Sequence, residues 1–144
     1  MPSPAFRPAL LCLLVVALVA CDDGPTANPQ DSLACNTTVG SIGIGSDVTG
    51  VLTPQSCRFA DGTYADRWLM QLDTAVIITI DMESTDVDSF LIIRDASGML
   101  LAQDDDGGGS PHARITHGFA AGTYYVIANT YYQSELGGYS LAIQ

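Results

Sequence analysis

The chain has 144 residues, and five Arg with no Lys stand against sixteen acidic residues, which gives a net charge of −11. This balance excludes a nucleic-acid-binding protein, because phosphate binding needs clustered Lys or Arg. An acidic surface instead suits solubility outside the cell and the binding of cations.

The first 20 residues have the pattern of a signal peptide. Arg7 is the only charged residue before position 22, and an apolar run follows it over residues 9–20. The run has the length of a signal-peptide apolar region and is too short to span a bilayer as a stable helix. We therefore expect residues 1–20 to be removed on export.

The apolar run ends in a short motif that resembles the processing site of bacterial lipoproteins. It reads Leu18-Val19-Ala20-Cys21, an aliphatic residue and two small or aliphatic residues before a cysteine. The resemblance implies that the chain is cut before Cys21 and that this residue is lipidated and acylated, with palmitate as an expected acyl chain. Two or more acyl chains hold a protein on a membrane where one is marginal. The alternative is an ordinary secretory signal, with Cys21 a plain thiol; the choice between inner and outer membrane stays open.

Residues 21–32 are predicted to be the lipidated cysteine and a flexible tether, since they lack apolar periodicity and carry two Pro. Residues 33–144 are enough chain for one hydrophobic core and not for two. Cys35 and Cys57 form an even pair in an oxidising compartment, and we expect one disulfide between them. Closing a loop of that length contributes about 3 kcal/mol by the chain-entropy estimate.

Residues 33–144 predict an all-β fold, because β-branched and aromatic runs alternate with glycine-rich turns and no stretch has helical spacing. Trp68, Met70 and Leu72, for example, share one face of a period-2 pattern. Such faces bury against each other in a sandwich. We predict an antiparallel, jelly-roll-like β-sandwich of about eight strands at residues 47–52, 64–72, 76–82, 89–94, 99–103, 113–119, 123–130 and 139–143.

Five short motifs follow one another along this region. They are Gly50-Val51-Leu52, Asp66-Arg67-Trp68, the acidic glycine-rich run 104–109, Gly122-Thr123-Tyr124 and Gly138-Tyr139. Their order and spacing over residues 47–144 resemble the bacterial pre-peptidase C-terminal domain, a small β-sandwich module of secreted proteins. The family commonly follows a peptidase catalytic domain, whereas a signal and a tether precede the module here.

Two groups of acidic residues are candidates for a Ca²⁺ site. Asp86 and Asp88 precede a predicted strand, and Asp104, Asp105 and Asp106 lie in the glycine-rich run. Oxygen ligands on flexible backbone suit Ca²⁺, which accepts six to eight oxygens at loose geometry, and some members of the resembled family bind Ca²⁺. The alternative is that these aspartates serve turns or are solvated. Under that alternative, Arg114 pairs with a loop carboxylate.

Tyr131 and Tyr132 are candidates for a binding surface. They lie in a predicted loop between the last two strands, beside amide side chains, and exposed tyrosines beside amides often contact peptides or glycans. The alternative is that they pack over a sheet edge. We expect no catalytic residue, because the sequence has no Gly-x-Ser-x-Gly elbow, no His-Glu-x-x-His motif and no P-loop.

The sequence therefore predicts a membrane-anchored cell-envelope lipoprotein that presents a non-catalytic binding or adhesion module, modulated by Ca²⁺. The expected partners are the lipid bilayer, through acylated Cys21, and an extracellular polymer or protein. The alternative function is a structural envelope component, or an accessory to a separate secreted hydrolase, without a ligand site of its own.

Overall fold

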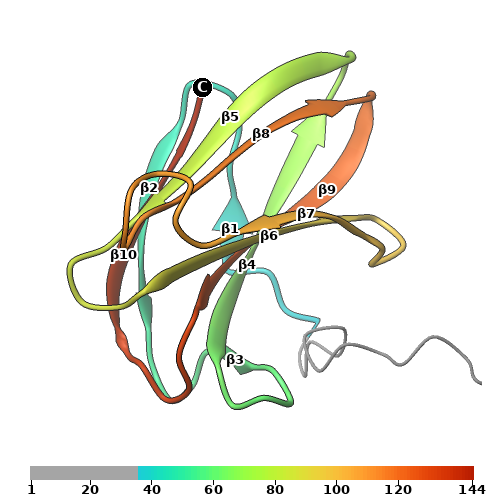
Figure 1. Cartoon of the computed structure of the whole chain (residues 1–144). Helices are drawn as coiled ribbons and strands as arrows, with labels where there is room; N and C mark the ends of the chain where they lie inside the picture. Colours follow the sequence, from blue (N-terminus) through green and yellow to red (C-terminus); the bar gives the residue numbers. More distant parts are fainter. Residues whose placement is uncertain (1–35) are drawn as a thin grey trace, which may run out of the picture.

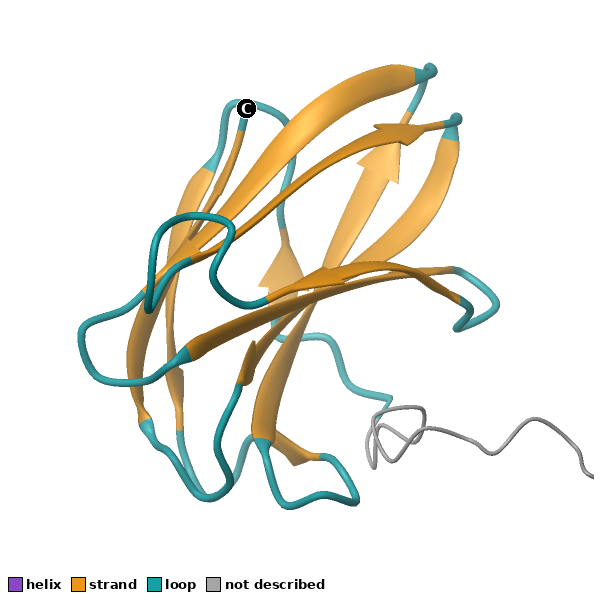
Figure 2. Ribbon diagram, viewed as in Figure 1, coloured by secondary structure: helices purple, strands orange, loops and turns teal. Residues whose placement is uncertain are grey.

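The computed structural model describes residues 36–144, which form two β-sheets packed face to face (Figures 1 and 2). The larger sheet has the order β1 (Gly40–Ser41), β4 (Tyr64–Leu72), β9 (Gly122–Thr130), β6 (Ser89–Asp95), β7 (Leu100–Asp104), and β3 (Cys57–Arg58) pairs with β4. The smaller sheet has the order β2 (Asp47–Leu52), β10 (Gly137–Ile143), β5 (Val76–Glu83), β8 (Ala113–Phe119). Residues 36–144 contain no helix that is long and apolar enough to cross a membrane.

The eight long strands pair in a nested pattern. β2 pairs with β10, β4 with β9, β5 with β8 and β6 with β7, all antiparallel. The chain is thus one long hairpin rolled into two sheets, which is a jelly roll. The predicted all-β sandwich is confirmed, with every predicted strand present. The two further strands, β1 and β3, have two residues each, and runs this short show no alternation in a sequence.

The main core lies between the sheets. Trp68, Met70 and Leu72 of β4 face inward as predicted, with Met70 fully buried. Buried aliphatic side chains from both sheets complete it, including Leu52, Ile78, Ile80, Met82, Leu91, Ile93, Val126, Leu141 and Ile143. This burial is the main source of stability in the sandwich.

A second, smaller cluster covers part of the outer face of the larger sheet. Its buried members are Cys57, Phe59, Ala65, Phe90, Ile92 and Ile127. Because of this cover β6 is buried on both faces, as its continuous apolar sequence predicts. Cys57 is disulfide-bonded, and its expected partner, Cys35, lies outside the described residues, so the pairing itself stays a prediction.

A buried polar chain links the two sheets through the core. The Trp68 indole Nε1 donates to the Tyr139 hydroxyl (2.9 Å), and that hydroxyl donates to Asp66 Oδ2 (2.8 Å). Asp66 and Trp68 lie on β4, whereas Tyr139 lies on β10 of the other sheet. Burial raises the pKa of Tyr139, so its hydroxyl remains a neutral donor. Gly50 of β2 stands directly opposite Tyr139 and leaves room for its ring.

The β6–β7 hairpin shows the predicted turn chemistry. Asp95 Oδ1 accepts hydrogen bonds from Ser97 N, Ser97 Oγ and Met99 N at 2.6–3.0 Å. The Ser97 hydroxyl bond is the main reason that the pKa of Asp95 is lowered. Gly98 has φ +88°, a backbone conformation that favours glycine, so the Asp and Gly together explain the turn.

Candidate binding surface

The chain leaves the larger sheet after β9 with two tyrosines exposed. Tyr131 is 50% exposed, Tyr132 is 59% exposed and Leu136 in the same loop is 42% exposed; we call these three side chains the tyrosine surface. The Tyr131 ring packs against buried Phe90, with ring centres 6.1 Å apart, and stands nearly perpendicular to the Tyr132 ring at 5.0 Å. Tyr131 therefore packs over the sheet on one side while half of it faces solvent.

Hydrogen bonds tie the backbone of this loop to the sandwich. Tyr131 N donates to Asp88 O (2.8 Å), Thr130 Oγ1 donates to Tyr132 O (2.8 Å), and Ser134 N donates to Gly62 O (3.2 Å). The loop connects β9 of one sheet to β10 of the other at one end of the sandwich (Figure 1). A partner that binds this surface meets a backbone that is already ordered, which reduces the entropy cost of binding.

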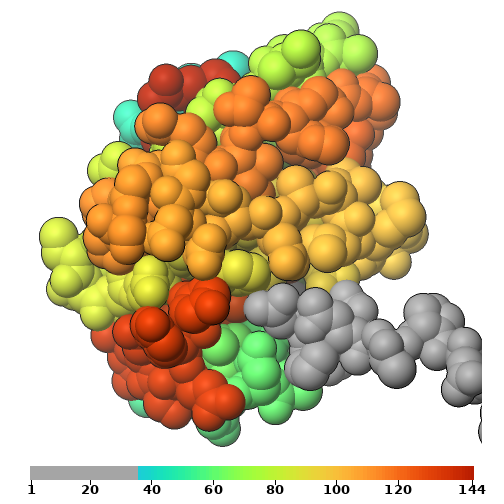
Figure 3. All heavy atoms as spheres, in the orientation of Figure 1, coloured from blue at the N-terminus to red at the C-terminus, as the bar shows by residue number. Residues whose placement is uncertain are grey.

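Asp88 lies directly beside the tyrosine surface. Ser89 pairs with Thr130 at the end of the β6–β9 register, and the next residues, Asp88 and Tyr131, are joined by the hydrogen bond from Tyr131 N to Asp88 O. Asp88 N donates to Glu135 Oε2 (3.2 Å). In the space-filling view, the orange-red segment after β9 lies beside the yellow-green segment that leads into β6 (Figure 3).

The Asp88 carboxylate is poorly compensated. Its Oδ1 is buried and has no hydrogen-bond partner among the described residues. Burial raises the pKa of Asp88, and the charges of Asp106 and Asp105 raise it further. We call Asp88, Asp105, Asp106 and Glu135 the acidic margin; Glu135 is the member that the sequence reasoning missed, because only the loop geometry brings it to Asp88.

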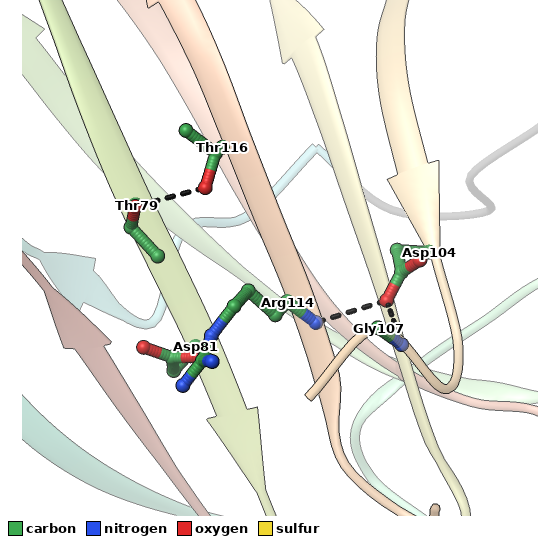
Figure 4. A network of polar contacts seen from close by, with 6 residues as sticks. All are labelled: Thr79, Asp81, Asp104, Gly107, Arg114 and Thr116. Atoms are coloured by element: carbon green, nitrogen blue, oxygen red, sulfur yellow. Dashed lines mark hydrogen bonds and ion pairs between the residues drawn. The ribbon is translucent and has the colours of Figure 1, made fainter. Parts of the chain in front are cut away.

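The other predicted Ca²⁺ candidates are held by backbone groups. Asp104 Oδ2 accepts from Gly107 N (2.7 Å) and Arg114 N (2.9 Å), as Figure 4 shows. Asp86 Oδ2 accepts from Gly138 N (2.9 Å). Gly138 lies in β10 of the smaller sheet, whereas Asp88 precedes β6 of the larger sheet. Among the described residues, no three His, Cys, Asp or Glu side chains converge as metal ligands. The five aspartates do not form one group, and Ca²⁺ binding stays an untested prediction.

Arg114 pairs with a strand carboxylate and not with a loop carboxylate as the turn alternative supposed. Its Nε donates to Asp81 Oδ1 at 2.5 Å, across the β5–β8 pair (Figure 4). Asp81 is buried, so the ion pair offsets part of the cost of desolvating its carboxylate. Thr79 and Thr116 extend the same cross-strand row with a hydroxyl hydrogen bond of 2.9 Å.

Replacing Asp104 with Asn tests whether this carboxylate serves the turn or a metal. We expect the variant to be less stable by about 1 kcal/mol, because two backbone donors lose a charged acceptor. Since both bonds exist without metal, the loss should be the same in EDTA and in millimolar Ca²⁺, measured by thermal unfolding. A loss seen only in Ca²⁺ would instead assign Asp104 to a metal site.

Ser84 and His112 lie close together but do not form a nucleophile–base pair. His112 lies with Ser84 in a shallow hollow of about 430 Å³, but its Nδ1 accepts from the Ser84 backbone N at 3.3 Å. The Ser84 hydroxyl donates to Gly138 O (2.7 Å) and accepts from the N–H groups of Asp86 and Val87. Ser84 Oγ is thus occupied by backbone partners, and His112 bonds the backbone of Ser84 and not its hydroxyl.

A solved structure shares this fold. The chain is similar to the pre-peptidase C-terminal domain of a collagenase from Bacillus anthracis, with TM-score 0.60 and 18% identity over 76% of this chain and 99% of that one. It also matches PliG of Aeromonas hydrophila, a periplasmic inhibitor of g-type lysozyme, with TM-score 0.46 and 10% identity over 74% and 98%. No family model matches the sequence, and no curated protein matches it.

The match at TM-score 0.60 defines the fold class of the module. The described residues form an all-β sandwich with the fold of a pre-peptidase C-terminal domain, as the order of motifs predicted. At 18% identity the similarity establishes the fold alone.

Proposed function

We propose that the protein is a non-catalytic binding module of the bacterial cell envelope, which holds an extracellular protein or polymer through the tyrosine surface. The observation that carries this proposal is the pair of half-exposed rings, Tyr131 and Tyr132, on a backbone tied to the sandwich. Tyrosines concentrate at binding interfaces because they offer large, rigid contact area with a polar tip. The occupied Ser84 hydroxyl supports a role without catalysis.

Capture from envelope fractions tests the proposal. We expect Tyr131→Ala combined with Tyr132→Ala to weaken capture at least about tenfold, since aromatic residues at the centre of an interface commonly contribute 2 kcal/mol or more. The matched control is Val51→Ala with Ile77→Ala, which trims two exposed side chains of the other sheet. Equal capture by both double variants would remove the tyrosine surface from the proposal. Absence of any saturable capture would favour a structural envelope component.

We further propose that acylated Cys21 anchors the module to the membrane; Cys21 lies outside the described residues. Cys21→Ser should move the protein from the membrane fraction to the soluble fraction, because the acyl chains supply the membrane affinity. Fractionation and metabolic labelling with a fatty acid are the measurements. Continued membrane retention without label would refute lipidation at this cysteine.

A further inference from the structure

We infer that the tyrosine surface takes an Arg- or Lys-bearing segment of a partner protein, with one cation placed between the Tyr131 ring and the Asp88 carboxylate. This inference rests on the proposed function and names the chemical class of the partner. Two features of the surface support it: carboxylates without a counter-ion among the described arginines, and two half-exposed tyrosine rings beside them.

The acidic margin has no internal counter-ion. The four arginines of residues 36–144 are engaged elsewhere: Arg58 with Gly62 O, Arg67 with Asn36 O, Arg94 with Gly98 O and Arg114 with Asp81. No described arginine forms an ion pair with the four carboxylates of the margin. Their negative field is therefore available to a partner, and it repels anionic polymers such as nucleic acid.

Asp88 is the member of the acidic margin that lies beside Tyr131. Its Oδ1 is buried without a partner, and its ionised form is disfavoured by burial and by Asp106 and Asp105. A guanidinium or ammonium group beside this carboxylate offsets the repulsion from Asp106 and Asp105. Because Asp88 and Tyr131 lie side by side just beyond the paired ends of β6 and β9, where Tyr131 N donates to Asp88 O (2.8 Å), the same cation can contact the Tyr131 ring.

The aromatic geometry also favours a cation. Tyr131 and Tyr132 meet edge to face, at 86° and 5.0 Å between ring centres, so they do not form one flat platform. Tyrosine faces in this chain already hold arginines: Arg67 lies 4.5 Å from the centre of the Tyr125 ring, and Arg58 lies 5.5 Å from that of Tyr64. A protein segment with spaced cations can use both the rings and the margin, whereas a neutral glycan uses the rings alone.

The test uses the purified protein and two synthetic peptides, Gly-Arg-Gly-Arg-Gly and the same peptide with citrulline, a neutral isostere of arginine. We expect the arginine peptide to bind and the citrulline peptide to bind at least about tenfold more weakly, measured by calorimetry at low salt. Asp88→Asn should weaken arginine-peptide binding by a similar factor. Asp73→Asn, which removes the same charge from an exposed turn, should change it less than about twofold.

Each other outcome overturns the inference. Equal losses of arginine-peptide affinity in Asp88→Asn and Asp73→Asn would show diffuse attraction to an acidic protein. Equal binding of the arginine and citrulline peptides would show that the positive charge does not contribute to recognition. Asp88→Asn removes a carboxylate whose ionised form folding disfavours, so a thermal melt should show an intact fold. If the arginine peptide fails while envelope capture still depends on Tyr131 and Tyr132, the binding function stands and the cationic partner is wrong.

Discussion

Gly50→Ala should be among the most destabilising single-methyl additions to this sandwich. A Cβ at position 50 would lie 2.2 Å from the Tyr139 hydroxyl oxygen and 2.3 Å from Cζ, distances that require something to move. If the Tyr139 ring moves, Asp66 loses its donor and the Trp68 indole loses its acceptor. If the ring stays, β2 must separate from β10. We expect a loss of roughly 3 kcal/mol or more, combining overpacking with unpaired buried polar groups.

Urea unfolding of the variant measures this loss, and Gly118→Ala is its matched control. Gly118 also lies in a strand of the smaller sheet, yet a Cβ there would meet only Ile77 Cγ1 at 3.7 Å, an ordinary contact. We expect the control to stay within about 0.5 kcal/mol of the parent protein. Similar midpoints for the two variants would mean that β2 and β10 adjust without cost, and the proposed fit of Gly50 against Tyr139 would be wrong.

Tyr139→Phe should have the second largest effect, although it removes a single oxygen. That oxygen donates to the Asp66 carboxylate, which is 6% exposed, and accepts from Trp68 Nε1. Asp66 stays buried and Trp68 stays partly buried after the substitution, so both lose a hydrogen-bond partner inside the sandwich. We expect a loss of about 3 kcal/mol, because hydrogen bonds to charged groups contribute more than neutral ones and orphaned partners add a desolvation cost.

The lone tryptophan provides a second measurement for this variant. Trp68 is the only tryptophan of the chain, so loss of its indole hydrogen bond should change the near-ultraviolet circular dichroism of the folded protein. Tyr124→Phe is the control, since the Tyr124 hydroxyl makes one bond, to Ala120 O (2.9 Å). We expect that control to lose about 1 kcal/mol and to leave the tryptophan signal unchanged. Equal losses would show that the buried chain adds nothing beyond one ordinary hydrogen bond.

The buried chain and the tyrosine surface have different roles in one architecture. The chain from Trp68 to Asp66 crosses the core and joins the sheets, whereas the tyrosine surface lies on a loop at one end of the sandwich. Loops on a rigid scaffold carry binding residues because their sequence can change without disturbing the core. Substitutions at Tyr131 and Tyr132 should therefore alter binding while leaving the fold intact.

Local pattern was sufficient to predict the eight long strands. The ends of the strands at Asp47–Leu52, Tyr64–Leu72 and Ala113–Phe119 agree with the prediction at both termini, because alternation of apolar and polar residues is a property of neighbouring positions. The turn at Asp95 followed for the same reason, since its hydrogen bonds reach only to Ser97 and Met99. The candidate tyrosines were also found from the sequence, as aromatic residues just past a predicted strand.

The tertiary structure alone decided what those strands and residues meet. Asp88 and Asp86 were predicted to form one group because both precede the same strand. The pairing of β6 with β9 instead places Asp88 beside Tyr131, and the loop brings Glu135 to it. Asp86 instead holds Gly138, fifty-two positions away. The alternation of apolar and polar residues predicts which face of a strand a residue occupies, but it does not predict which strand lies beside it. That choice comes from burying all the apolar faces at once, so the nested pairing and the binding surface depend on contacts that are distant in the sequence.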